Sequence, residues 1–233
     1  MTAMESWAYI NALVFVDTKF PSGAFRFSNG IESAIEYGFC RDPDSLEHFV
    51  RCQLLYSELT KCEFALVAGK LELHNRSDLL TDLNAILTTR ISSLAERQSL
   101  IKKGKSFLRM FEAVLERPLN HLNNMYYPVL FGTLYACQNN TLLNLGESYI
   151  YDAIQSGICA SQRLLGLDPY LSASLSLRLT HAFLADIAKI RDRLDKIKPE
   201  IADLETVLSS GTWPIGEMLA ELHIKNEEAL FEN

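Results

Sequence analysis

The chain has 233 residues, and its 22 Lys+Arg against 29 Asp+Glu give a net charge of −7 at pH 7. This acidity argues against a nucleic-acid binder, which needs a basic face to displace counterions from phosphates. With 48% hydrophobic and 22% charged residues, the composition is that of a globular protein with a core rather than of a disordered chain.

Helices are the expected elements throughout the chain. Glycine and proline, at 11 and 7 residues, are scarce enough to favour long helices with few breaks. Apolar spacing predicts helices, in chain order, at about 5–16, 28–37, from Asp42 onward, 77–91, 94–116, 121–137, 141–165 and 171–185, with a further one from Leu184 to Ile197. No stretch shows sustained strand alternation, and no repeat or low-complexity linker divides the chain. We therefore expect an all-α fold, a single compact multi-helix domain of about ten helices spanning 1–233.

The clearest local signals are helix ends. Asp42 can cap a helix whose first position is Pro43, and Pro199 ends the stripe that begins at Leu184. A break over 209–216 sets apart a C-terminal segment, 217–233, that mixes apolar residues with glutamates. This segment is either a last helix packed on the core or an arm that docks on a partner.

The sequence also suggests a compartment. Five scattered cysteines without a C-x-x-C pair indicate neither a disulfide framework nor a thiolate zinc site. No apolar run reaches the length of a membrane span, and the N-terminus lacks the basic region that opens a signal peptide. We expect a cytoplasmic protein that is not membrane-bound.

Candidate chemistry is sparse. Gly104-Lys105-Ser106 imitates the end of a phosphate-binding loop, but the motif needs a glycine where this chain has Ser99, and no strand precedes it. His48 and Cys52 stand at i, i+4 on one helix, which is half of a metal site at most. We predict no catalytic residue, no metal site and no cofactor. A basic run is better interpreted as a solvated helix face that could steer an acidic partner: Lys102, Lys103, Lys105 and Arg109.

The most informative stretch runs from Asp17 to Glu32. Pro21 and Gly23 predict a tight connection that holds two phenylalanines, and Ser28 can cap the helix that follows. From the residues alone, a structural elbow with two core aromatics remains an alternative to a functional loop.

Eight residues of this stretch keep a fixed spacing: Asp17, Pro21, Gly23, Phe25, Ser28, Gly30, Glu32 and Ala34. In this pattern the chain resembles the family of urease accessory protein F (UreF), whose N-terminal signature reads roughly D-x-x-x-P-x-G-x-F-x-x-S-x-G-x-E-x-A. Weaker matches follow in the family's order at Arg97 and Gly104, over 127–132 and over 160–164. The chain departs from the family pattern at Tyr126, over 166–169 and at Ala229, so the resemblance is to a divergent member.

The resemblance implies an all-helical adaptor, not an enzyme, that supports nickel insertion into apo-urease. It implies a homodimer with two accessory partners, a G-type GTPase and a D/H-type scaffold, and a coupling of GTP hydrolysis to metal transfer. By the match, the loop and Glu32 are expected at or near the GTPase-facing surface, and 217–233, including Leu230 and Phe231, at the scaffold.

Two other functions stay open from the sequence. One is a small all-helical lyase or hydrolase whose pocket is assembled from sequence-distant residues. The other is a helical nucleic-acid regulator, which the net charge of −7 opposes.

Overall fold

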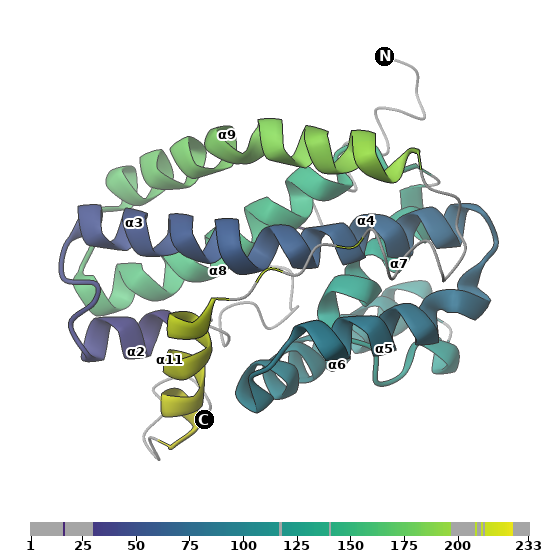
Figure 1. Cartoon of the computed structure of the whole chain (residues 1–233), viewed down its shortest axis with the longest axis horizontal. Helices are drawn as coiled ribbons and strands as arrows, with labels where there is room; N and C mark the ends of the chain where they lie inside the picture. The colour runs from purple at the N-terminus through teal and green to yellow at the C-terminus, as the bar shows by residue number, and fades with distance from the viewer. Residues whose placement is uncertain are drawn as a thin grey trace.

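The structure is a computed structural model that describes Val16, residues 30–116, 118–139, 141–196, 208, 211 and 213–225. Within these ranges every regular element is helical, which confirms the all-α expectation (Figure 1). None of these helices combines the length and hydropathy that crossing a lipid bilayer requires.

The described elements are, in chain order, α2 (Ile31–Glu36), α3 (Pro43–Gln53), the π-helical turn η2 (Leu54–Glu58), α4 (Leu59–Leu73), the 3-10 turn η3 (Ser77–Leu79), α5 (Leu80–Arg90), α6 (Leu94–Leu115), the 3-10 turn η4 (Asn120–Leu122), α7 (Tyr127–Asn139), α8 (Leu145–Leu165), α9 (Pro169–Leu194) and α11 (Pro214–Lys225). Because α3, η2 and α4 run on without a break, the described ranges hold eight α-helical rods, slightly fewer than the ten expected.

The helix starts follow the sequence signals closely. Asp42 caps α3, since its carboxylate accepts from the Ser45 amide at 2.8 Å while the Ser45 hydroxyl accepts from the Asp42 amide at 3.1 Å. Hydrogen bonds donated to this carboxylate, first by the Ser45 amide and then by the Ser45 hydroxyl, lower the pKa of Asp42. Pro43 occupies the first helical position, as predicted.

The division of the chain near Leu184 was wrong. The structure has one helix, α9, where the sequence suggested separate helices at 171–185 and 184–197. The buried positions Leu179, Phe183 and Ile187 continue one stripe across the expected junction, so nothing there interrupts the helix.

The centre of the fold is the crossing of α4 and α7, whose contact is the most extensive between any two described elements. At this crossing Gly132 lies against the backbone of Ala65, so closely that a Cβ at Gly132 would overlap the Ala65 carbonyl. The glycine therefore allows two helices to approach at backbone distance. Gly132 ends the 127–132 run noted in the sequence, so close helix packing explains the glycine at that position.

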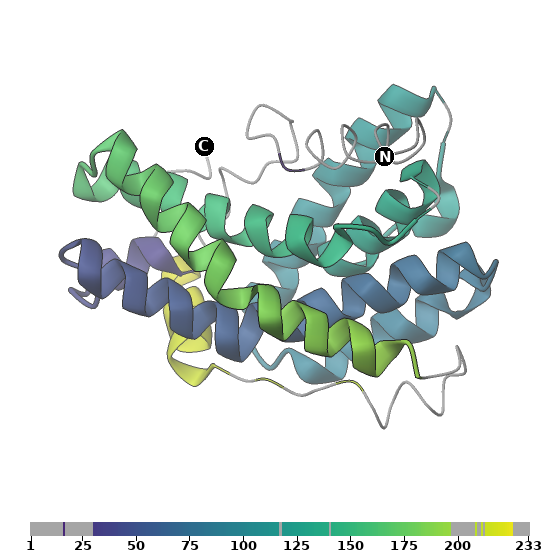
Figure 2. The ribbon, with the colours of Figure 1, turned by 90° about the horizontal axis from the view of Figure 1, so that it is seen from above.

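The remaining helices surround this crossing. Figure 1 shows α9 along one side of the α3–α4 rod and α5 and α6 on the other, while α11 lies below the rod; Figure 2 shows α9 crossing the rod obliquely. Buried apolar side chains from α2 to α11 form one continuous cluster.

Candidate functional site

The second half of the loop signature begins α2. Gly30 adopts a left-handed backbone with φ of 83° at the N-cap, a conformation that glycine accepts without strain. The following Ile31 is fully buried and packs on α8, where a Cβ added at Gly157 would come within 2.7 Å of Ile31 Cδ1. Glu32, in the first turn of α2, is only 9% exposed. Close packing on α8 therefore fixes the position of this turn.

The other end of α2 exposes two aromatic side chains. Gly38, with φ of 76°, turns the chain, and the amide of Phe39 donates to the Ala34 carbonyl at 2.7 Å. Tyr37 and Phe39 are 48% and 50% exposed, which is unusual for such large apolar rings. The end of α2 thus presents apolar surface beside a rigid turn.

Most of the predicted partner-binding residues lie outside the described residues. These are Asp17, Pro21, Gly23, Phe25, Ser28, Leu230 and Phe231. Gly30 and Glu32 are the two that the structure describes. Glu32 lies in the first turn of α2 as predicted, but the N-cap is Gly30 and not Ser28, so the helix begins later than the sequence suggested.

The C-terminal segment forms α11, which caps another helix. Glu221 accepts from the Ala95 amide at 3.0 Å and from the Ser93 hydroxyl at 2.8 Å, at the N-terminus of α6. A carboxylate at this end satisfies an unpaired amide and meets the positive end of the helix dipole. The Trp213 ring packs edge-on against Phe49 at 4.7 Å between centroids. The described part of 217–233 is thus a helix packed on the core.

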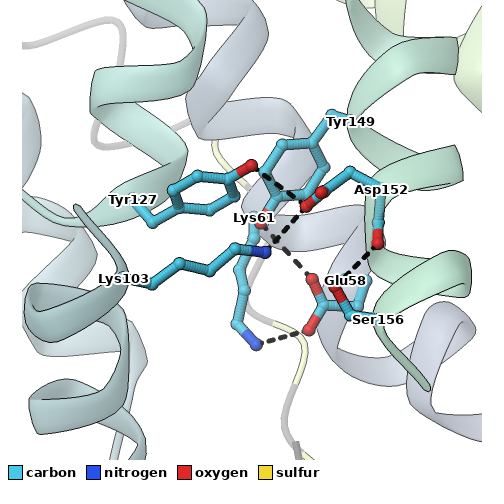
Figure 3. Close-up of polar contacts among 7 residues, drawn as sticks. All are labelled: Glu58, Lys61, Lys103, Tyr127, Tyr149, Asp152 and Ser156. Carbon is cyan, nitrogen blue, oxygen red and sulfur yellow. Dashed lines mark hydrogen bonds and ion pairs between the residues drawn. The ribbon is translucent and has the colours of Figure 1, made fainter. Parts of the chain in front are cut away.

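A buried polar network, which the sequence did not reveal, lies between α4, α6, α7 and α8 (Figure 3). In its first half Lys103 Nζ is 2.7 Å from Asp152 Oδ2, and the Tyr127 hydroxyl donates to the same oxygen at 3.0 Å. The ammonium also lies 3.9 Å from the centre of the Tyr127 ring, a cation–π contact. The two charged side chains are 8% and 7% exposed.

The second half of the network begins at the π-helical turn. Glu58, at the end of η2, accepts from Lys61 Nζ at 2.7 Å through one oxygen and from the Tyr149 hydroxyl at 3.3 Å through the other. Lys61 also pairs with Glu96 of α6. A π-helical turn is wider than an α-helical one, and here its last residue carries the carboxylate that joins α4 to α8, while Lys61 makes the link to α6.

Burial sets the ionisation of these groups. Burial by itself would lower the pKa of Lys61, but the charges of Glu58 and Glu96 outweigh it and raise that pKa. The pKa of Tyr127 is raised by burial and then by Asp152, and the pKa of Tyr149 by burial and then by Glu58. Lys61 is therefore held as a cation and both tyrosines as neutral donors. Such a network fixes how four helices meet.

The weak chemical motifs prove to be structural. Gly104 lies within α6, where a Cβ would come within 2.8 Å of the Met125 carbonyl, so the phosphate-loop imitation is a helix-packing site. The thiol of Cys52 is 3.7 Å from His48 Nε2 on α3. Among the described residues, however, no three His, Cys, Asp or Glu side chains are grouped so as to hold a metal ion. The basic run was partly misassigned, because Lys103 is buried in the network rather than solvated.

One small cavity, with about 260 Å³ of empty space including open solvent, lies between Lys61, Glu96 and Gly211. Pockets that hold small ligands are usually larger and mostly apolar, about 300–1,000 Å³. The buried network itself reaches this cavity only through Lys61 and Glu96.

Sequence reasoning missed the network because its members lie far apart in the chain. Lys103 and Asp152 are 49 positions apart, and Glu58 and Tyr149 are 91. One signal was present: Lys61 and Glu63 flank Cys62 just before the apolar run 64–68, in a helix that is buried along most of its length. Charges in such a helix need partners.

Comparison with known proteins points to the same family as the N-terminal signature. A family model described as UreF matches residues 40–180, more than half of the chain. Proteins named urease accessory protein UreF from Yersinia enterocolitica serotype O:8 / biotype 1B and from Yersinia pestis strain Pestoides F are each 27% identical over 239 aligned positions. A protein of the same name from Yersinia pseudotuberculosis serotype IB is 26% identical. Each alignment covers 99% of this chain and 100% of the relative.

Proposed function

This chain belongs to the UreF family of urease accessory proteins, and we propose that it is an adaptor that supports nickel insertion into apo-urease. It is an accessory protein rather than an enzyme, in keeping with its relatives. In this proposal it acts as a metallocentre-assembly chaperone with a G-type GTPase and a D/H-type scaffold accessory protein. Nickel is the cargo of the assembly, and the chain needs no resident cofactor.

The observation that carries the proposal is the extent of the similarity. It runs over 99% of this chain and 100% of the relatives named urease accessory protein, so the aligned region spans the loop, the helical core and the C-terminal segment. The helical core offers a rigid frame, fixed by the α4–α7 crossing and the buried network. A rigid frame with exposed apolar turns suits a protein that works through contacts.

The GTPase-facing surface is proposed at the start of the chain. It comprises the signature loop from Asp17 to Gly30 and the first turn of α2. Glu32 is 9% exposed, so its contribution is to hold this turn in place rather than to offer a large contact area. Tyr37 and Phe39, about half exposed at the other end of α2, supply apolar contact area beside it.

The proposed mechanism is a coupling of two equilibria. An adaptor can make nickel transfer depend on GTP hydrolysis only if it binds the two nucleotide states of the GTPase with different affinity. A difference of about 1.4 kcal/mol between the states changes the affinity tenfold. The segment 217–233, with Leu230 and Phe231, is the proposed docking element for the scaffold.

Assembly and location complete the proposal. We expect a homodimer that contacts apo-urease through its accessory partners, in the cytoplasm, without binding nucleic acid or membrane. The five free cysteines suit a reducing compartment.

Size-exclusion chromatography of the purified chain with its cognate GTPase and scaffold tests the proposal. A stable complex at micromolar concentration is expected, and three separate peaks would overturn it. Glu32→Ala should leave the fold intact, by circular dichroism, yet weaken the coupling to the GTPase in reconstituted urease activation. Glu36→Ala, on the same helix, is the matched control. Equal activation by both variants would remove Glu32 from the proposed surface.

A further inference from the structure

We propose that the outward face of α9 is the surface through which two copies of this chain pair. This inference rests on the proposed function, which includes a homodimer but does not say which surface forms it. The face is a largely apolar row that we call the α9 seam, and its members are Tyr170, Ala173, Leu177, His181, Leu184 and Ala188. All six side chains are exposed.

The spacing of these residues places them in one straight row. Their separations along the chain are 3, 4, 4, 3 and 4 positions, a mean of about 3.6, which is one helical turn. The row therefore runs parallel to the helix axis for five turns, about 27 Å. A separate row of α9 is buried in the core and holds Leu175, Leu179, Phe183 and Ile187. The helix thus has a second apolar side that faces solvent.

The large side chains of the seam are unusually exposed. Tyr170 is 86% exposed, Leu177 is 59% exposed and Leu184 is 38% exposed. These three residues stand seven positions apart, the repeat along which two helices pair. Figure 1 shows α9 at the edge of the described helices, with no other labelled helix on its outer side. An apolar row of this length on a surface helix marks a contact surface.

The seam is also free of formal charge. None of its six members is Asp, Glu, Lys or Arg. Cations beside it are held by acids of the same chain, in the ion pairs of Arg178 with Glu47 at 2.7 Å, Lys189 with Asp186 at 2.9 Å and Arg191 with Glu147 at 2.6 Å. Two chains that each carry a net charge of −7 repel one another, so a surface without charge is where they can meet.

The two halves of the seam match each other. A two-fold axis presents the same patch on both copies. An axis midway between positions 180 and 181 brings Leu177 opposite Leu184 of the second copy, and Ala173 opposite Ala188 of the second copy. The two α9 helices then run antiparallel, with leucine against leucine at the middle and alanine against alanine further out. Small residues at the outer contacts let the helix axes approach to about 8–10 Å.

A second copy is favoured over a different protein as the occupant. Charged groups at an interface guide encounter and select a foreign partner, and the seam offers none. Its symmetry about the middle is instead what an isologous contact between identical chains requires. Pairing of two seams removes both apolar rows from water at once.

Sedimentation velocity of the full chain between 1 and 100 µM tests the proposal. The wild type should sediment as a dimer in the upper part of this range. The seam variant carries Leu177→Glu and Leu184→Glu, which keep helix-forming residues at exposed positions and place glutamate opposite glutamate at both central contacts. Its dimer dissociation constant should rise at least tenfold.

The control variant makes the same change on another helix. It carries Leu94→Glu and Val114→Glu at the two ends of α6, where the side chains are 60% and 67% exposed, away from α9 in Figure 1. Its dimer dissociation constant should stay within twofold of the wild type. Circular dichroism should show both variants folded.

A disulfide test fixes the direction of pairing. An equimolar mixture of the Ala173→Cys and Ala188→Cys variants is oxidised, with the wild type treated alongside to account for the native cysteines. The antiparallel arrangement predicts more cross-linked dimer in the mixture than in either variant alone. Equal or stronger cross-linking of each variant alone would overturn that arrangement.

The results separate the seam from the proposed function. If the wild type is monomeric up to 100 µM, or if the seam variant dimerises like the control, the seam proposal is wrong. The adaptor function still stands in that case if the chain forms its complex with the GTPase and the scaffold. If the chain dimerises through the seam but binds neither protein, the proposed function fails alone. A seam variant that keeps the wild-type dimer but loses the scaffold would overturn the assignment to a second copy.

Discussion

Replacement of Asp152 by alanine tests the buried network most sharply. The carboxylate lies 2.7 Å from Lys103 Nζ and accepts from the Tyr127 hydroxyl at 3.0 Å. Its removal leaves a buried ammonium without its counter-charge, which costs about 3–5 kcal/mol, and a buried hydroxyl without an acceptor, which costs about 1 kcal/mol more. The cation–π contact with Tyr127 is too weak to offset this loss.

The expected result is a free energy of unfolding lower by about 4–6 kcal/mol. For a chain of this size each kcal/mol lowers Tm by about 2–4 °C, so the fall in Tm should be about 8–24 °C. Urea unfolding followed by circular dichroism measures the first quantity, and thermal unfolding the second. Asp186→Ala, which removes the partly exposed partner of the exposed Lys189, is the matched control and should cost less than about 1 kcal/mol.

A double substitution separates a lost pair from a lost fold. Lys103→Met with Asp152→Leu removes both charges together, so its loss should be well below the sum of the two single losses. The reasoning is refuted if Asp152→Ala costs no more than Asp186→Ala, or if the double variant loses as much as the two single variants added together.

Three further outcomes are expected. Gly132→Ala should abolish folding, because its Cβ would overlap the Ala65 carbonyl. Gly166→Ala has open space around the added Cβ but a φ of 61°, so it should lower the free energy of unfolding in urea by only about 1–2 kcal/mol. Equal losses for the two variants would contradict the packing account. Glu221→Gln should weaken the cap on α6, seen as faster hydrogen exchange at its first amides than in wild type, and unchanged exchange would exclude the cap. The free energy of unfolding should fall as pH rises above about 10. The reason is that Lys61 and the buried tyrosines keep their protons in the folded state, whereas the same groups lose them in the unfolded chain. A free energy of unfolding that stays constant between pH 9 and 11 would contradict this.

The local part of the fold was predictable from local sequence. The Asp42 cap and Pro43 start of α3 involve residues within one turn of each other, so the sequence contains the whole cause. The junction near Leu184 was mispredicted because two overlapping apolar stripes look alike whether or not a helix stops between them. Whether the helix continues depends on packing, and here the buried positions follow one continuous face of α9.

For the candidate site, the spacing of the signature residues was predictable from the sequence, but the burial of its side chains was not. The signature positions were visible as a spacing, and Gly30 does adopt a left-handed backbone where the pattern has glycine. Burial of Glu32 was not visible, because it depends on how α2 packs on α8. The same holds for Lys103: the nearby Lys102 and Lys105 are exposed, while its partner is 49 positions away. Pairing across such distances depends on tertiary structure.

Reconstituted urease activation tests the central claim most directly. Apo-urease, nickel, GTP, the cognate GTPase and the scaffold are incubated with and without this chain, and urease activity is followed over time. The account predicts that activation depends on the chain and on GTP hydrolysis, so that a non-hydrolysable GTP analogue abolishes the gain. Equal activation without the chain would contradict its role as the adaptor.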